Sequence, residues 1–192
     1  MIKHFIKLVL AVAVVAGFTF QARSAHAAAD AFLVFADTTG AAVCKGGSTD
    51  AAHPGSIQLA SFDFGIENTL NIGSATGGAG AGKAKFTSFT FSHNLDVASS
   101  CISSYLAQGR TLAATLYVRK AGGAGAQDFL VVQFKTVAFA TQHLTSASDV
   151  PSEAVTFQFG SESFKYYAQN PNGTLGAPSA FTWDAVRNMN AF

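Results

Sequence analysis

The glycine-rich stretch SATGGAGAGKAKF, residues 74–86, is similar in spacing to a phosphate-binding loop. Gly77, four further residues, Gly82 and Lys83 match the P-loop, in which backbone N–H groups surround phosphates and the lysine reaches them. A P-loop also needs Ser or Thr after the lysine to hold magnesium, but Ala84 stands there. The residues that follow alternate like a β-strand, whereas a P-loop leads into a helix whose N-terminus faces the phosphate. We therefore interpret this stretch as a loop and expect no bound nucleotide.

The other reactive side chains form no catalytic or metal-binding motif. The segment FGSES around Ser161 does not have the spacing of the G-x-S-x-G nucleophile motif. His53, His93 and His143 are far apart, without the H-E-x-x-H spacing of a zinc site. Convergence of these three histidines on one metal, or Cys44 acting as a nucleophile, are the weaker alternatives. We expect no cofactor and no enzymatic activity.

The N-terminal segment has the features of a secretory signal peptide. Two lysines lie in the first seven residues, an uncharged apolar run covers 8–20, and an A-x-A pattern ends at Ala27. The apolar run is too short to span a bilayer comfortably. We predict that residues 1–27 are removed and that 28–192 form one domain in the periplasm or outside the cell.

The charge of the mature chain excludes some classes of partner. Loss of Lys3, Lys7 and Arg23 reduces the 12 basic residues to 9, against 11 acidic residues, for a formal charge of −2. Such a chain has no basic surface for nucleic acid or anionic lipid. Its partners must recognise shape and strand edges instead.

Export also bears on the two cysteines, Cys44 and Cys101. In an oxidising compartment they could pair within the chain, pair between neighbouring subunits, or remain thiols. An unstrained bridge within the chain would stabilise the fold by about 4 kcal/mol, because it closes a long loop. The sequence alone does not choose among these states, since it does not fix cysteine geometry.

The rest of the mature chain is dominated by apolar residues that alternate with a period of two, which predicts β-strands. Phe, with 18 copies, favours sheets. One segment, 94–109, has helical spacing instead, with Asn94 or Asp96 as its N-cap and Gly109 at its end. Phe89 and Phe91 are expected on one face, with Thr90 opposite. Strands are expected within 31–36, 56–67, 84–93, 111–120, 128–144, 153–167 and 180–188, and loops at 121–127, 145–152 and 170–179.

The inward-facing residues of the segment 111–120 are expected to be Leu112, Ala114, Leu116 and Val118, every second residue of a strand. With seven or eight strands and one helix, the chain is predicted to be all-β with one helix, as a small barrel or sandwich.

In their order along the chain, several of these segments resemble the haemolysin-coregulated protein (Hcp) family, the inner-tube subunits of the bacterial type VI secretion system. The resemblance covers nearly all of 30–192. It rests on DAFLVFADTTG (30–40), IQLASFDFGIEN (57–68), GGAGAGKAKFTSFTFSHNLD (77–96), LYVRKAGG (116–123) with QDFLVVQFKTVAFA (127–140), VTFQFGSESFKYYAQNPNG (155–173) and FTWDAVRN (181–188).

The resemblance implies a compact β-barrel of two packed antiparallel sheets with a helix on one flank, and no catalytic centre. It also implies that the chain forms hexameric rings, which stack into a tube that carries secreted effectors and works with other type VI secretion components. In the family, the long loop after the first strand reaches a neighbouring ring. The matching candidate residues are Thr38, Thr39, Cys44, Lys45, Asp50 and His53.

The signal-peptide pattern departs from this family, whose usual member is built in the cytoplasm. Three interpretations follow. The chain is an Hcp-like ring, filament or cargo carrier that acts after export; or it is an ordinary tube subunit with a misassigned start; or it is an exported barrel that serves as a binding or adhesion module.

Overall fold

The computed structural model describes residues 29–68, 83–120, 126–146 and 149–192. The predicted signal peptide, most of the glycine-rich stretch and most of the predicted turn at 121–127 lie outside these residues. Within the described part of the chain, no helix is long and apolar enough to cross a membrane.

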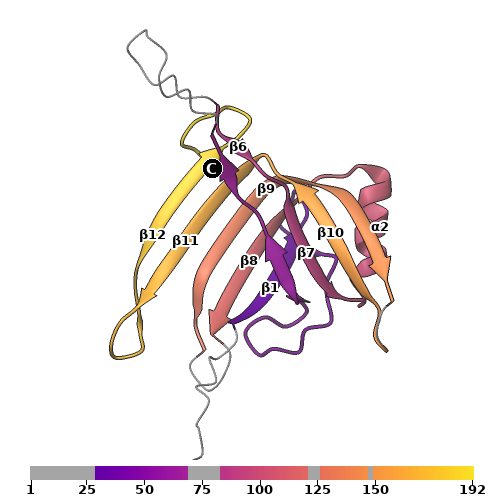
Figure 1. Cartoon of the computed structure of the whole chain (residues 1–192), viewed down its shortest axis with the longest axis horizontal. Coiled ribbons are helices and arrows are strands. Elements are labelled where there is room, and N and C mark those ends of the chain that lie inside the picture. Colours follow the sequence, from indigo (N-terminus) through magenta and orange to yellow (C-terminus); the bar gives the residue numbers. More distant parts are fainter. Residues whose placement is uncertain (1–28, 69–82, 121–125, 147–148) are drawn as a thin grey trace, which may run out of the picture.

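Antiparallel strands make up most of the fold, as the alternation predicts (Figure 1). Ten of them are linked along the path β2-β1-β8-β9-β10-β7-β4, with β3 beside β1 and with β11 and β12 continuing from β9. A separate pair, β5 with β6, forms a short second sheet. The strands are β1 (Ala29–Ala36), β2 (Ala42–Val43), β3 (Ile57–Leu59), β4 (Ser61–Asp63), β5 (Ile66–Glu67), β6 (Lys85–Phe86), β7 (Phe89–Asn94), β8 (Leu112–Lys120), β9 (Asp128–Thr145), β10 (Ser152–Gln158), β11 (Ser161–Gln169) and β12 (Leu175–Asp184).

The long strand β9 belongs to both halves of the molecule. Its residues 130–135 pair with β11, and its residues 138–145 pair with β10. Thr136 lies between these two stretches with a positive φ of 52°, so the strand changes direction there. One half of β9 therefore sits with β8, β11 and β12, and the other half faces them with β10 and β7.

The expected single strand over 56–67 is wrong, because the chain changes sheets at Ala60. Before it, β3 pairs with β1; after it, β4 pairs with β7. The Ala60 N–H donates to the carbonyl of Ser92 at 2.8 Å, which fixes the crossing point. Core-facing positions consequently shift from Ile57 and Leu59 to Phe62 and neighbouring even-numbered residues.

The strand path between β2 and β4 is not closed by pairing among the described residues. The structure is therefore mostly β with two facing antiparallel halves, and the closed barrel implied by the family resemblance is not observed among the described residues.

The expected loop over 170–179 is longer than the one in the structure. The turn occupies only Asn170–Thr174, whose ends are joined by a 2.8 Å backbone hydrogen bond, and β12 begins at Leu175.

A cluster of phenylalanines fills the space between the two halves. Phe89 of β7 stacks on Phe157 of β10 with ring centroids 4.7 Å apart, and Phe134 of β9 meets Phe89 edge-on at 5.3 Å. Such pairs add to the stability that burial of their large apolar area provides. The predicted inward positions of β7 and β8 are confirmed, since Phe89, Phe91, Leu112, Ala114, Leu116 and Val118 are all buried.

The predicted helix is present but shorter than expected. Helix α2 (Ser99–Gln108) ends at Gly109, whose left-handed φ of 61° is the predicted stop. It begins five residues after Asn94, because the Asp96 carboxylate accepts from the N–H of Ala98 and holds the preceding residues in a turn. The helix lies beside the β9–β10 end of the molecule, on the side away from β12 (Figure 1).

Candidate functional site

The candidate ring-stacking loop joins β1 to β3 and begins with a tight turn that points to solvent. The Asp37 carboxylate accepts from the backbone N–H of Thr39 at 2.8 Å and from its hydroxyl at 2.6 Å. These hydrogen bonds hold the pKa of Asp37 below its ordinary value, and the bond from the Thr39 hydroxyl has the largest effect. Burial acts in the opposite direction but is outweighed. Thr38 and Thr39 are exposed at this tip, on a rigid turn.

A disulfide connects the loop to the helix. Cys44 directly follows β2 and is bonded to Cys101 in α2, with Cα atoms 5.1 Å apart. Cys44 is buried in the core cluster and has a positive φ of 46°. The bridge thus joins two parts of the chain separated by 57 residues in sequence.

The second part of the loop packs closely on itself. A Cβ atom at Gly46 would lie 2.4 Å from the carbonyl oxygen of Ser56, so only glycine fits there. Backbone bonds join Gly46 to Gly55 at 2.9 Å and Ser48 to Ser56 at 3.1 Å. The Gly47 N–H donates to Asp96 at 2.9 Å, which adds a second link to the start of the helix.

His53 ends up between two aromatic rings on the outer face of the sheet. Its ring centroid lies 4.8 Å from that of Phe32 in β1 and 4.6 Å from that of Tyr117 in β8. Its Nε2 lies 2.9 Å from the Asp128 carboxylate of β9. The side chain is buried, and His53 thereby fixes the loop to three strands.

Arg119 connects the same carboxylates. Its Nε donates to Asp128 and its Nη1 to Asp50, both at 3.0 Å. The guanidinium group is itself buried, so its charge is balanced by two partly exposed carboxylates. Burial alone would raise the pKa of Asp50. Hydrogen bonds from the N–H groups of Ala52 and His53, together with the charge of Arg119, outweigh this effect and lower the pKa below its ordinary value.

The pKa of Tyr117 is shifted in the opposite direction to that of Asp50. Burial first, and then the negative charge of Asp128, raise the pKa of its phenol above the ordinary value. The phenol stays neutral near pH 7 and contributes as an aromatic surface under His53.

The six candidate loop residues therefore fall into two groups. Thr38, Thr39 and Lys45 are exposed, whereas Cys44 and His53 are buried and Asp50 is half-buried in the ion-pair cluster. Sequence reasoning missed Arg119 and Asp128, which flank the predicted turn at 121–127. Opposite charges at the two ends of a predicted hairpin were the available signal, because such residues face each other across the strands.

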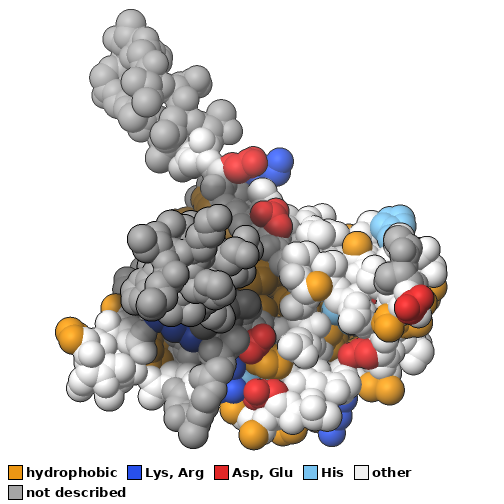
Figure 2. Space-filling model, turned by 60° about the horizontal axis from the view of Figure 1, so that its bottom comes forward, with side chains coloured by type: hydrophobic (Ala, Val, Ile, Leu, Met, Phe, Trp, Pro, Cys, Tyr) orange, Lys and Arg blue, Asp and Glu red, His pale blue; other side chains and the backbone are white. Residues whose placement is uncertain are grey.

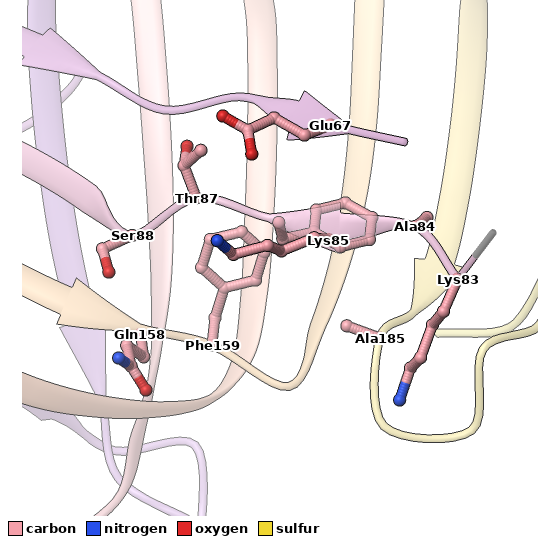
Figure 3. A pocket seen from close by; sticks show the side chains of 10 residues that line it. Glu67, Lys83, Ala84, Lys85, Thr87, Ser88, Gln158, Phe159 and Ala185 are labelled. Atoms are coloured by element: carbon pink, nitrogen blue, oxygen red, sulfur yellow. The ribbon is translucent and has the colours of Figure 1, made fainter. Parts of the chain in front are cut away.

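A surface hollow of about 690 Å³ lies beside the short β5–β6 pair (Figure 3). Glu67 and Lys85 lie opposite each other on these two strands, next to Phe159. Lys83, the lysine of the P-loop-like stretch, also lines the hollow, and the chain then enters strand β6 rather than a helix. Gly77 and Gly82 lie outside the described residues. The hollow is open and carries charges of both signs.

A buried polar network lies under α2. His93 Nε2 is 2.8 Å from Glu153, and Gln142 donates to the other carboxylate oxygen at 2.7 Å. Gln142 also donates to the carbonyl of Ser99 and accepts from Ser103. The network ties β7, β9 and β10 to the helix.

The three histidines do not converge. His53 and His93 pair with different carboxylates, and His143 is exposed. Across the described ranges, no group of three His, Cys, Asp or Glu side chains could hold a metal ion. The hydroxyl of Ser56, the serine bonded to His53, donates to the backbone carbonyl of that histidine rather than to its ring.

The surface carries few charges, and they are dispersed. On the face shown in Figure 2, Lys, Arg, Asp and Glu side chains are scattered among neutral atoms. Among the strands that the structure describes, β12 pairs only with β11, and its central residues, 177–181, are exposed. The molecule thus presents a long strand edge and a surface with few charges.

Comparison with known proteins points to one family. The family model described as "Type VI secretion system effector, Hcp" matches residues 32–166, well over half of the chain. Among curated protein sequences, none matches this chain.

Solved structures agree with the family match. A structure described as that of a type six secretion system protein is 25% identical, has a TM-score of 0.76, and covers 85% of this chain and 100% of its own. Hcp1 from Salmonella typhimurium is 25% identical with a TM-score of 0.66, covering 85% of this chain and 99% of its own. A type VI secretion system effector from Yersinia pestis shares the fold at 22% identity and a TM-score of 0.62, covering 80% and 98%. The chain therefore belongs to the Hcp family of type VI secretion proteins.

Proposed function

We propose that the mature chain, 28–192, is a structural tube subunit that assembles into hexameric rings, which stack and carry effectors in their lumen. The observation that carries this proposal is the family match over 32–166, together with a fold that spans the whole of a related solved structure. Hcp proteins are structural, secreted tube proteins that form ring oligomers, and they are not enzymes.

The free edge of β12 supports ring formation. An unpaired strand edge promotes association with another chain, and a head-to-tail contact that closes on itself gives a ring. The scattered charges of the surface give copies of the chain little mutual repulsion. Contacts between copies would then depend on backbone pairing and on shape.

The loop between β1 and β3 supports contacts between stacked rings. Thr38, Thr39 and Lys45 are exposed on a segment fixed by the disulfide and by the Arg119 ion pairs. A segment that is already ordered loses little conformational entropy when it binds. We propose these three residues as the part of the loop that reaches the next ring.

The disulfide supports action after export. Bridges of this kind form and persist in oxidising compartments, which agrees with a signal peptide removed after Ala27. We propose that the chain works in the periplasm or outside the cell. An exported Hcp-like binding or adhesion module is the alternative that the same two features favour.

Electron microscopy of the purified mature protein, combined with its solution mass, tests these proposals. Rings with an open centre and a hexamer-scale mass are expected. A monomer at high concentration would contradict the tube subunit and favour the binding module. An N-terminus at Ala28 in protein recovered from the periplasm tests export separately.

Charge substitution tests the loop. Lys45→Glu combined with Thr39→Asp should leave single rings intact but prevent their stacking, because the contact between rings would then bury two unpaired carboxylates. Ser104→Asp, at an exposed position of α2, is the matched control and should stack normally. Normal stacking of the loop variant would show that the contact lies elsewhere.

A further inference from the structure

Glu162 of β11 is a buried carboxyl group in apolar surroundings. Its side chain is 2% exposed, and the residues directly opposite are Phe134 in β9 and Trp183 in β12. Its oxygen Oε2 has no hydrogen-bond partner, and neither has the buried indole N–H of Trp183. An unpaired polar atom away from water is costly, so this pair of neighbours is a weak point of the sheet.

The charged residues of the neighbouring strands do not face Glu162. Directly opposite residues in antiparallel strands project to the same face of the sheet. Lys135 and Asp184 both lie opposite Ser161, one position along, and therefore project to the other face. On that other face also lie Lys165 of β11, Arg187 bound to Asp184, and Asp128 bound to Arg119 and His53.

More distant charged groups belong to other sites. Glu67, Lys83 and Lys85 of the β5–β6 segment line the hollow beside Phe159, and His143 lies in the half of β9 that pairs with β10. Burial raises the pKa of Glu162 to about 7. The carboxyl group is thus neutral in mildly acidic solution and becomes charged as the pH passes neutrality.

A charge at this position can reach water most easily by movement of β12. Among the described strands it is the outermost of its half and pairs with β11 alone, apart from a bridge between Asp184 at its end and Met189 in the turn that follows. Opening it would expose the carboxylate and Trp183 while leaving the phenylalanine core between β7, β9 and β10 in place. Edge elements with few neighbours open at lower free energy than core strands do.

We propose that Glu162 is a pH-sensitive switch for the edge strand: protonated, it holds β12 and Trp183 closed against β11; ionised, it releases them to water. The switch acts within a single chain. It therefore controls how firmly the free edge is presented, and it does not depend on ring assembly.

The chain contains its own reporter, because Trp183 is its single tryptophan. The emission maximum of dilute mature protein should shift to longer wavelength between pH 5.5 and 8.5, with a midpoint near 7. Glu162→Gln keeps the shape and stays neutral, so its emission should remain at the shorter wavelength throughout. Glu67→Gln, which removes an exposed carboxylate, is the matched control and should titrate like the wild type.

Two results would overturn the switch. One is a wild-type emission maximum that does not move over this pH range. The other is a transition that persists in Glu162→Gln, because the transition would then belong to the histidines. Should Glu162→Gln not fold, NMR titration of the Glu162 side-chain carboxyl in the wild type decides the matter. A midpoint near 7, with faster amide exchange in β12 above it, supports the switch; a midpoint below 5 refutes it.

Discussion

The disulfide between Cys44 and Cys101 offers a quantitative test of how the loop and helix are held. The bridge closes a chain segment of 57 residues. In the chain-entropy account, a closed loop of this length stabilises the folded state by about 4 kcal/mol, because the cross-link restricts the unfolded chain. The variant Cys44→Ala/Cys101→Ala should lose that amount, and its melting temperature should fall by roughly 10 °C for a chain of this size.

Urea unfolding of the oxidised wild type, the reduced wild type and the double variant measures this loss. The reduced protein and the variant should both be less stable than the oxidised protein. Reductant should change the wild type but leave the variant unaffected, which controls for effects of the reductant itself. A loss below about 1 kcal/mol, with unchanged dependence on urea, would refute the reasoning and would mean that the loop is fixed by its other contacts alone.

Three further perturbations test the ion pairs, the loop packing and the buried carboxyl group. Arg119→Met should cost about 2–4 kcal/mol and speed amide exchange over 44–56, because two carboxylates lose their cation; unchanged exchange would show that the ion pairs do not hold the loop. Gly46→Ala should cost more than about 2 kcal/mol in urea unfolding, since its Cβ would lie 2.4 Å from Ser56 oxygen; a cost below 1 kcal/mol would mean that the loop shifts freely. The folded-state pKa of Glu162, about 7, exceeds its ordinary value of 4.5, so its contribution is complete below pH 4.5 and disappears as the pH rises through 7. Glu162→Gln should therefore be more stable than the wild type at pH 8 by about 3 kcal/mol and about equal to it at pH 4.5, and an equal difference at both pH values would contradict this linkage.

The local pattern of the strands could be predicted from the sequence because it depends on alternation. Phe89 and Phe91 face the core for the reason the pattern implies, and Gly109 ends the helix in the left-handed conformation expected of it. The crossing at Ala60 could not be predicted, since it depends on which distant strand pairs with each side of that residue. The helix start was misplaced because Asp96 accepts backbone hydrogen bonds in a turn of its own.

The candidate site shows the same limit. Exposed Thr38 and Lys45 could be recognised from loop composition, but the buried position of His53 depends on rings from β1 and β8 that the sequence does not bring together. The burial of Glu162 could not be predicted for a similar reason. A glutamate in an alternating strand gives no sign of being buried until the opposite residues are known.

The course of β9 has a consequence for how the molecule comes apart. One part of β9 pairs with β8 and β11, and the other part pairs with β10. Both halves of the protein therefore need β9 to complete their strand pairing. Cleavage of the polypeptide inside β9 would leave two fragments that each lack part of this shared strand. Cleavage in the turn after β11 would leave β9 intact.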